Sequence, residues 1–184
     1  MLKDNDIVIV ETGTLLYGMS QIRLPTGVTY IAQGGWQSIG YATPAAFGAC
    51  IAAKNRRVLL FTGDGSLQFT VQEISSVVEN GCIPVIFILN NGVYAIEKYL
   101  NVRTQNQKYN QVPHWKYTKL ADVFRGETFA VEVRTNRELD EAISQAQNAN
   151  KLCMIQMMIN DPLDVPDYLH KMRRYLEERE KQQS

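Results

Sequence analysis

Two short polar segments each follow an apolar run, and their side chains carry oxygen atoms of the kind that can hold a metal ion. The sequence Gly-Asp-Gly-Ser at 63–66 comes after the apolar residues 58–61, and Asn-Asn-Gly at 90–92 comes after residues 84–89. The 24 residues from 66 to 89 are about enough for one helix and one strand, so the two apolar runs are expected to be neighbouring parallel strands. Open α/β sheets bind ligands outside the carboxyl ends of their strands. The pattern therefore predicts a binding site at this edge of a sheet.

The side chains at these two strand ends suit a magnesium ion and a phosphate group. Asp64, Ser66 and Asn91 offer a carboxylate, a hydroxyl and a carboxamide. Mg²⁺ prefers oxygen ligands and usually completes its shell with water and substrate phosphates. A glycine on each side of Asp64 lets the backbone approach a phosphate closely. We therefore predict a clamp for magnesium and a diphosphate; the sequence contains neither a complete dinucleotide fingerprint nor a Walker A motif.

The composition is that of a globular chain with one domain. The chain has 184 residues, and 19 Lys and Arg balance 19 Asp and Glu, which argues against binding to nucleic acid or an anionic membrane surface. No stretch approaches the roughly 20 apolar residues of a membrane span, and the first residues lack the apolar core of a signal peptide. Three cysteines without a CxxC spacing are typical of a reducing compartment, so we expect a cytoplasmic protein.

Apolar runs and helical periodicities alternate along the chain. The expected strands are residues 7–10, 57–62, 84–89, 128–133 and 152–159, and the expected helices are residues 38–53, 67–80, 117–124, 138–148 and 165–181. Residues 63–65 are expected to form a turn and 101–115 a surface loop, with Gly81 as a helix stop and Asn136 as an N-cap. This alternation predicts an α/β fold in which a parallel β-sheet carries helices on both faces. We expect a single domain over residues 1–184, with 165–181 as its helical tail.

Longer motifs surround these strand ends. They are Glu-Thr-Gly-Thr at 11–14, Trp-Gln-Ser-Ile-Gly-Tyr at 36–41, Gly-Asp-Gly-Ser-Leu-Gln at 63–68, Val-Gln-Glu-Ile at 71–74 and Leu-Asn-Asn-Gly-Val-Tyr-Ala-Ile-Glu at 89–97. Together they resemble the diphosphate-binding (PP) domain of thiamine diphosphate-dependent enzymes, in particular the pyruvate and indolepyruvate decarboxylase group. The similarity extends from about residue 5 to residue 154. It implies the thiamine diphosphate-binding fold, with thiamine diphosphate and Mg²⁺ as cofactors.

The resemblance implies a role for each matching residue around the metal and the diphosphate. Asp64 and Asn91 would bind Mg²⁺ through side-chain oxygens, and Val93 through its backbone carbonyl. The diphosphate would receive hydrogen bonds from Thr14, Gly65 and Ser66.

The resemblance also implies residues around the reactive part of the cofactor. Ile39 would wedge beneath the cofactor, and the carbonyl of Gln37 would accept a hydrogen bond from its aminopyrimidine. Glu97 would lie over the reactive carbon and assist proton transfer, in an apolar setting that favours a retained proton. The implied site further includes Ser38, Gly63, Tyr94 and Ile96 as cofactor-binding residues and Thr12 as a catalytic residue, and Leu16, Ile96 and Leu100 are candidate walls of the substrate pocket.

Two positions depart from the family pattern. Val93 and Gln37 each stand where the decarboxylases usually have glycine. Both implied roles use a backbone carbonyl, which any residue supplies. A backbone angle that only glycine reaches comfortably would be harder to keep. The backbone conformation at these two positions therefore bears directly on the implied roles.

The predicted function is part of a non-oxidative 2-oxo acid decarboxylase with a substrate of pyruvate, indolepyruvate or phenylpyruvate type. In this family a pyrimidine-binding domain and a middle domain complete each subunit, the enzyme is a homo-oligomer, and the cofactor lies between subunits. Neither of these domains is expected within residues 1–184. We therefore expect the isolated chain to be inactive, with the pyrimidine-binding domain supplied in cis or as a separate subunit.

Three other interpretations stay open. The chain could be the β-type subunit of a natural split enzyme, as in the sulfopyruvate decarboxylases. It could belong to a carboligase like the acetohydroxyacid synthases, although that group does not share the pattern at 94–97. It could also be a non-enzymatic binding or assembly domain that kept the fold.

Overall fold

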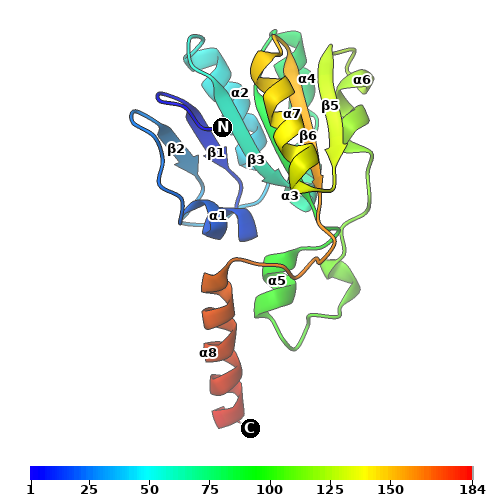
Figure 1. Ribbon diagram of the computed structural model, residues 1–184. Coiled ribbons are helices and arrows are strands. Elements are labelled where there is room, and N and C mark those ends of the chain that lie inside the picture. The colour runs from blue at the N-terminus through cyan, green and yellow to red at the C-terminus, as the bar shows by residue number, and fades with distance from the viewer. Residues whose placement is uncertain (184) are drawn as a thin grey trace.

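A six-stranded parallel β-sheet forms the centre of the molecule (Figure 1). The computed structural model describes residues 1–183, and the strands are β1 (Ile7–Val10), β2 (Thr29–Ala32), β3 (Val58–Gly63), β4 (Val85–Asn90), β5 (Thr128–Val133) and β6 (Leu152–Met158). Their order across the sheet is β2-β1-β3-β4-β6-β5, and every neighbouring pair is parallel. The central strands are apolar along most of their length because both faces of the sheet are covered.

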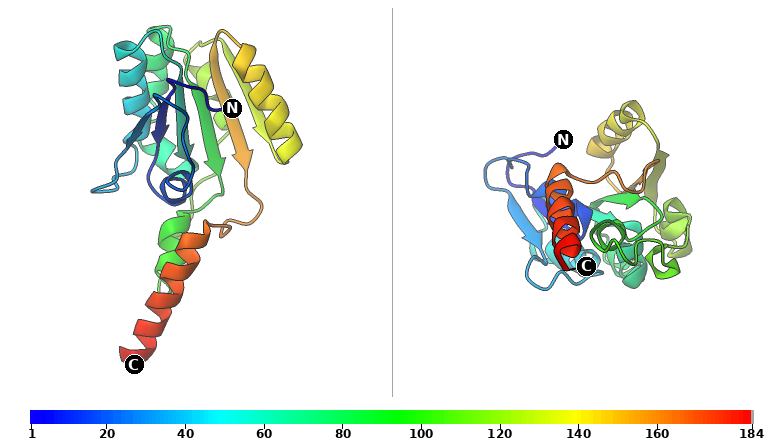
Figure 2. Two further views of the ribbon diagram at one scale, coloured as in Figure 1. Left: turned by 60° about the vertical axis from the view of Figure 1, so that its left-hand side comes forward. Right: turned by 90° about the horizontal axis from the view of Figure 1, so that it is seen from below.

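Helices cover both faces of the sheet, as Figures 1 and 2 show. They are α1 (Thr14–Met19), α2 (Ala42–Ala52), α3 (Asp64–Phe69), α4 (Glu73–Glu79), α5 (Ala95–Leu100), α6 (Leu120–Val123), α7 (Asn136–Asn148) and α8 (Asp167–Gln183), with 3₁₀ turns η1 (Lys108–Asn110) and η2 (Tyr117–Lys119). Successive strand residues point to opposite faces, so Leu60 belongs to the same buried cluster as Ile74 of α4, whereas Leu59 belongs to the cluster that contains Ala142 of α7. The expected α/β fold is confirmed. No helix within residues 1–183 is both long and apolar enough to span a membrane.

The sheet order brings three polar chain segments to one edge. β1, β3 and β4 are consecutive neighbours, with Val10 beside Phe61 and Gly63 beside Leu89. The segments that leave these strands start at residues 11, 64 and 91. The expectation that the two motif-bearing strands are parallel neighbours is therefore confirmed, and the strand at 7–10 places its own polar segment beside them.

Two helices lie beyond this edge of the sheet. α8 projects away from the sheet and runs beside α5 at its start (Figures 1 and 2). Tyr99 of α5 and Leu169 of α8 are buried in one small cluster, and the guanidinium of Arg173 lies 4.8 Å from the centre of the Tyr99 ring. The Tyr99 hydroxyl also hydrogen-bonds the ring of His170. α8 therefore supports α5, the helix that begins shortly after the Asn-Asn-Gly segment.

Two expected helices have different bounds in the structure. The helix expected at 38–53 begins only at Ala42, because Gly40 has a φ of 83°, outside the helical region. The helix expected at 67–80 is two helices, α3 and α4, separated at Thr70, which has a φ of −136°. The expected turn at 63–65 is instead the last residue of β3 and the first residues of α3. Gly81 does follow the end of α4 with a φ of 63°, as a helix stop requires.

Three further details differ from the sequence prediction. β2 has no counterpart among the expected strands; it is an edge strand, and Thr29 is exposed. The N-cap of α7 is Thr135 rather than Asn136, because its hydroxyl accepts the backbone N–H of Glu138 at 3.2 Å and the Glu138 carboxylate accepts the backbone N–H of Thr135 at 3.1 Å. The loop expected at 101–115 contains η1, and its residues Asn110 and Val112 are buried.

Candidate functional site

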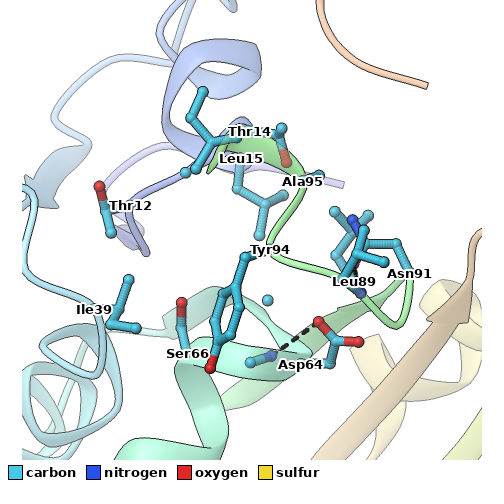
Figure 3. A pocket seen from close by; sticks show the side chains of 15 residues that line it. Thr12, Thr14, Leu15, Ile39, Asp64, Ser66, Leu89, Asn91, Tyr94 and Ala95 are labelled. Carbon is cyan, nitrogen blue, oxygen red and sulfur yellow. Dashed lines mark hydrogen bonds between the residues drawn. The ribbon is translucent and has the colours of Figure 1, made fainter. Parts of the chain in front are cut away.

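The carboxyl ends of β1, β3 and β4 surround a pocket (Figure 3). Its lining residues are Thr12, Gly13, Thr14, Leu15, Ile39, Gly63, Asp64, Gly65, Ser66, Leu89, Asn91, Val93, Tyr94, Ala95 and Ile96. Asp64 is the only charged residue among them. Ten of these fifteen were expected from the sequence as cofactor or metal residues and Thr12 as a catalytic residue, and the fold brings the eleven together from four separate chain segments.

Asp64 is a buried residue in the lining of this pocket and is only 3% exposed. Its Oδ1 accepts the backbone N–H of Gly65 at 2.8 Å, and its Oδ2 accepts the backbone N–H of Gly92 at 2.8 Å. Burial raises the pKa of Asp64, and the two N–H groups together with the nearby His114 ring oppose that rise. Asp64 therefore links the segment after β3 to the segment after β4.

The segment after β4 is stabilised by the buried chain around η1. The backbone N–H of Tyr94 donates to the Asn110 carbonyl at 2.9 Å, and the backbone N–H of Val112 donates to the Gly92 carbonyl at 2.9 Å. The side-chain oxygen of Asn91 accepts the backbone N–H of Val93 at 3.2 Å. Among the described residues, Val93 is not one of the non-glycine positions with a positive φ. A valine is thus compatible with the backbone here, although the decarboxylases usually have glycine.

Tyr94 occupies much of the space above Gly65. A Cβ atom placed on Gly65 would lie 2.4 Å from the Tyr94 ring and 2.9 Å from a methyl group of Val112. In the view of Figure 3 the Tyr94 ring lies between Ser66 and Asp64. Burial raises the pKa of the Tyr94 hydroxyl, and the charge of Asp64 adds to the rise. Only glycine fits at position 65 while the ring keeps this position.

The segment after β1 contributes Thr12, Gly13, Thr14 and Leu15 to the pocket. Thr12 is 7% exposed, and its hydroxyl oxygen is buried without a hydrogen-bond partner in the structure. Buried polar atoms are almost always hydrogen-bonded in folded proteins. Because Thr12 lines the pocket, its unpaired hydroxyl is a candidate partner for a polar group of a ligand.

Three of the expected site residues do not line the pocket. Gln37 and Ser38 are exposed on the segment that precedes α2, although their neighbour Ile39 does line it. Glu97 is exposed on the first turn of α5. The apolar surroundings that we expected for Glu97 are therefore not formed by the described residues.

Gln37 adopts the left-handed backbone conformation that glycine favours, with a φ of 53°. Its side-chain amide donates to the Tyr17 hydroxyl at 3.3 Å, and its backbone N–H donates to the side-chain oxygen of Gln33 at 3.0 Å. These two bonds help hold a conformation that costs a non-glycine residue free energy. Position 37 therefore keeps the backbone angle that glycine favours, although the residue here is glutamine.

The sequence prediction missed four lining residues, which are Gly13, Leu15, Leu89 and Ala95. Gly13, Leu15 and Ala95 are direct neighbours of residues that were expected in the site, and Leu89 lies two residues before Asn91, so proximity to the motifs could have suggested them. Of the three expected walls of the substrate pocket, Ile96 does line the pocket. Leu100 instead packs in the cluster between α5 and α8. Leu16 is not among the lining residues, whereas its neighbour Leu15 is. Side-chain direction on the short helix α1 decides between Leu15 and Leu16.

The donor atoms of the pocket favour a hard cation whose coordination shell is completed by a bound anion. The described side chains include no group of three or more His, Cys, Asp and Glu that could hold a metal ion. The pocket instead offers the Asp64 carboxylate, the Asn91 carboxamide and the Val93 carbonyl, which are all oxygen donors. Mg²⁺ takes few protein ligands and completes its octahedron with water and phosphate oxygens. The donor set thus fits magnesium bound together with a diphosphate.

Fold and site define a parallel α/β domain that presents a carboxylate, a carboxamide and small residues at three neighbouring strand ends. The sequence matches the family described as "Thiamine pyrophosphate enzyme, C-terminal TPP binding domain" over residues 12–157, and the chain belongs to this family. The resemblance read from the motifs is therefore confirmed.

Named relatives and a solved structure agree with this assignment. The chain is 38% identical over 181 residues to an alpha-keto-acid decarboxylase of Mycobacterium leprae (strain TN), covering 94% of this chain and 30% of that protein. It is 48% identical over 126 residues to a pyruvate decarboxylase of Aspergillus fumigatus, covering 67% of this chain and 22% of that protein. The structure of the thiamine diphosphate-dependent 4-hydroxybenzoylformate decarboxylase of Rhodococcus jostii RHA1 superposes with a TM-score of 0.76 at 25% identity, covering 89% of this chain and 31% of that one. The chain spans less than a third of each of these proteins.

Proposed function

We propose that this chain is the diphosphate- and magnesium-binding domain of a thiamine diphosphate-dependent, non-oxidative 2-oxo acid decarboxylase. The substrate would be of the pyruvate, indolepyruvate or phenylpyruvate type, and the enzyme would act in the cytoplasm. The observation that carries the proposal is the meeting of Thr12, Asp64, Gly65 and Asn91 in one pocket at three adjacent strand ends. The relatives named as decarboxylases support the reaction class.

Different residues of the pocket would bind Mg²⁺ and the diphosphate of the cofactor. Asp64, Asn91 and the carbonyl of Val93 would hold Mg²⁺, whose oxygen preference matches all three donors. Thr14, Gly63, Gly65 and Ser66 would hydrogen-bond or closely approach the diphosphate. Thiamine diphosphate, when bound, supplies the electron sink that decarboxylation of a 2-oxo acid needs and that no side chain provides.

The other pocket residues would act on the cofactor ring and on the substrate. Ile39, Tyr94 and Ile96 present apolar or aromatic surface to the pocket, which would orient the ring and exclude water. The hydroxyl of Thr12 has no partner and would bind a polar group of the ligand. Glu97, Gln37 and Ser38 would complete the site, and their exposure is consistent with a neighbouring domain that covers them.

The rest of the enzyme would come from outside these 184 residues. The named relatives are more than three times as long as the matched region. We propose that a pyrimidine-binding domain, in cis or as a separate subunit, completes the cofactor site in a homo-oligomer, and that the isolated chain releases no carbon dioxide. A β-type subunit of a split decarboxylase would meet the same description.

Titration calorimetry with thiamine diphosphate, in the presence and absence of Mg²⁺, tests the binding function in the full-length protein that contains this chain. We expect binding that requires Mg²⁺ and is lost in Asp64→Asn, because that change removes the only charged ligand in the pocket. Binding that ignores both Mg²⁺ and the substitution would contradict the proposal. Carbon dioxide release from pyruvate, phenylpyruvate and indolepyruvate then identifies the substrate, and accumulation of acetolactate from pyruvate would favour a carboligase instead.

A further inference from the structure

Glu11 is a fully buried carboxylate to which the proposed function gives no role. It directly follows β1 and is 0% exposed. Its Oε1 accepts the backbone N–H of Thr12 at 3.0 Å, and its Oε2 accepts the backbone N–H groups of Gly40 at 3.1 Å and Ala42 at 3.2 Å. Within residues 1–183, all the hydrogen bonds that the structure gives this carboxylate come from backbone N–H groups. Burial raises the pKa of Glu11, and these three N–H groups oppose the rise.

The three hydrogen bonds join two walls of the pocket that are far apart in the sequence. Gly40 and Ala42 lie 29 and 31 residues beyond Glu11. Thr12 lines the pocket on one side of this connection, and Ile39, the residue before Gly40, lines it on the other. The carboxylate of Glu11 therefore ties the turn after β1 to the chain that enters α2.

The chain that enters α2 also has the hydrogen bonds of Gln37 to Tyr17 and Gln33. Trp36 is 89% exposed, and the two residues that follow it are also exposed. The carbonyl of Gly40 accepts the hydroxyl of Thr70 at 2.9 Å, which connects this chain to the end of α3. Glu11 and Thr70 thus hold Gly40 through its N–H and its carbonyl, and Glu11 is the anchor that also reaches Thr12.

We propose that Glu11 is a positioning residue of the cofactor site: its carboxylate holds the backbone of Gly40 and Ala42 against Thr12 and so places Ile39 in the pocket. This inference rests on the proposed function. A carboxylate is suited to the task because it only accepts hydrogen bonds and offers about four acceptor sites on two oxygens. Glutamine has the same shape, but its amide nitrogen would face an N–H donor on one side.

Asp6 provides a matched control, because it is a second buried carboxylate at the other end of β1. It is 3% exposed, and its Oδ2 lies 2.6 Å from the guanidinium of Arg57. Asp6 does not line the pocket. Asp6→Asn should therefore lower thermal stability without changing cofactor affinity, whereas a change at Glu11 should lower affinity as well.

The test uses the full-length protein that contains this chain, as wild type and as Glu11→Gln, Glu11→Asp and Asp6→Asn. Thiamine diphosphate affinity with Mg²⁺ is measured by calorimetry, and hydrogen exchange is followed at the amides of Gly40 and Ala42 without cofactor. We expect Glu11→Gln to bind about tenfold or more weakly and to exchange both amides faster, because one buried donor loses its acceptor. Glu11→Asp keeps a carboxylate and should regain part of the affinity, while Asp6→Asn should match the wild type in both measurements.

The outcomes separate this inference from the proposed function. Glu11→Gln that binds cofactor as tightly as Asp6→Asn, with wild-type exchange at both amides, would overturn the inference and leave the proposed function standing. Wild-type protein that binds no cofactor would overturn the proposed function and the inference with it. If Glu11→Gln does not fold, Glu11→Asp decides by the same comparison with Asp6→Asn: unchanged affinity and exchange overturn the inference, and weaker binding with faster exchange supports it.

Discussion

Replacing Gly40 by alanine should destabilise the chain, although the same replacement at Gly48 in α2 should stabilise it. Gly40 has a φ of 83°, a conformation that costs an L-residue roughly 1–2 kcal/mol. A Cβ atom there would also lie 2.9 Å from the Cβ of Phe69 and 3.3 Å from a methyl group of Thr70. Overpacking of this kind costs typically about 1–3 kcal/mol. The two terms together predict a loss of about 2–5 kcal/mol for Gly40→Ala.

Gly48→Ala should change stability in the opposite direction. Gly48 is exposed in the interior of α2, and a Cβ atom there meets nothing within 4 Å. Alanine is favoured over glycine in a helix interior by about 1 kcal/mol. Two identical substitutions eight residues apart (40 and 48) are thus expected to have effects of opposite sign.

Urea and thermal unfolding of the 184-residue chain measure both effects. For a chain of this size each kcal/mol corresponds to about 2–4 °C in Tm. We expect Gly40→Ala to unfold at least about 4 °C below the wild type and Gly48→Ala to unfold slightly above it. A Gly40→Ala chain as stable as the wild type would refute the argument from backbone angle and packing. Faster exchange at the amide of Ala42 in Gly40→Ala would show that the strain reaches the chain held by Glu11.

Four other predictions concern different parts of the molecule. Gly65→Ala should displace the ring of Tyr94, which would lie 2.4 Å from the new Cβ, and a changed fluorescence or ring NMR signal of Tyr94 would report the displacement. Leu169→Ala should cost about 2–5 kcal/mol of the free energy that docks α8, because Leu169 is 0% exposed, and hydrogen exchange in α5 and α8 should then rise together. Thr135→Ala should lower the stability of α7 by about 0.5–2 kcal/mol without affecting cofactor binding, which calorimetry would verify. Hydrogen bonds from backbone N–H groups lower the pKa of Glu138 in the folded chain. Its contribution to the free energy of unfolding is therefore present above the unfolded pKa of about 4.5 and should be lost as the pH falls through the lower folded pKa. Unfolding measured as a function of pH should show this loss, and Glu138→Gln should remove it.

Much of the fold is predictable from local patterns in the sequence. The apolar runs at 7–10, 58–61 and 84–89 become β1, β3 and β4, because a strand buried on both faces needs continuous apolar residues. β2 escapes prediction because an edge strand with an exposed Thr29 lacks that signal. The break between α3 and α4 also escapes, since the apolar periodicity continues across it and only backbone hydrogen bonds mark the end of one helix and the start of the next.

The candidate site is predictable for residues within the strand-end motifs and less so elsewhere. Asp64 and Asn91 lie where the motifs place them, because a strand end is a local feature that neighbouring strands share. Glu97 lies within a strand-end motif and yet is exposed, since a position in a motif does not fix how the fold covers a side chain. The role of Glu11 was not visible in the sequence, because its partners Gly40 and Ala42 lie 29 and 31 residues away.

The sequence by itself determined the residue types, their spacing and the family, and with them the carboxylate, the carboxamide and the glycines that end two parallel strands. The tertiary structure alone decided which segments meet, because the strand order β2-β1-β3-β4-β6-β5 places the turn after β1 beside the segments that follow β3 and β4. It also decided that Tyr94 packs against Gly65, that Gln37 keeps a left-handed angle, and that Glu11 joins two pocket walls. The physical reason is that spacing along the chain encodes local geometry, whereas hydrogen bonds and packing between distant segments form only once the sheet has assembled.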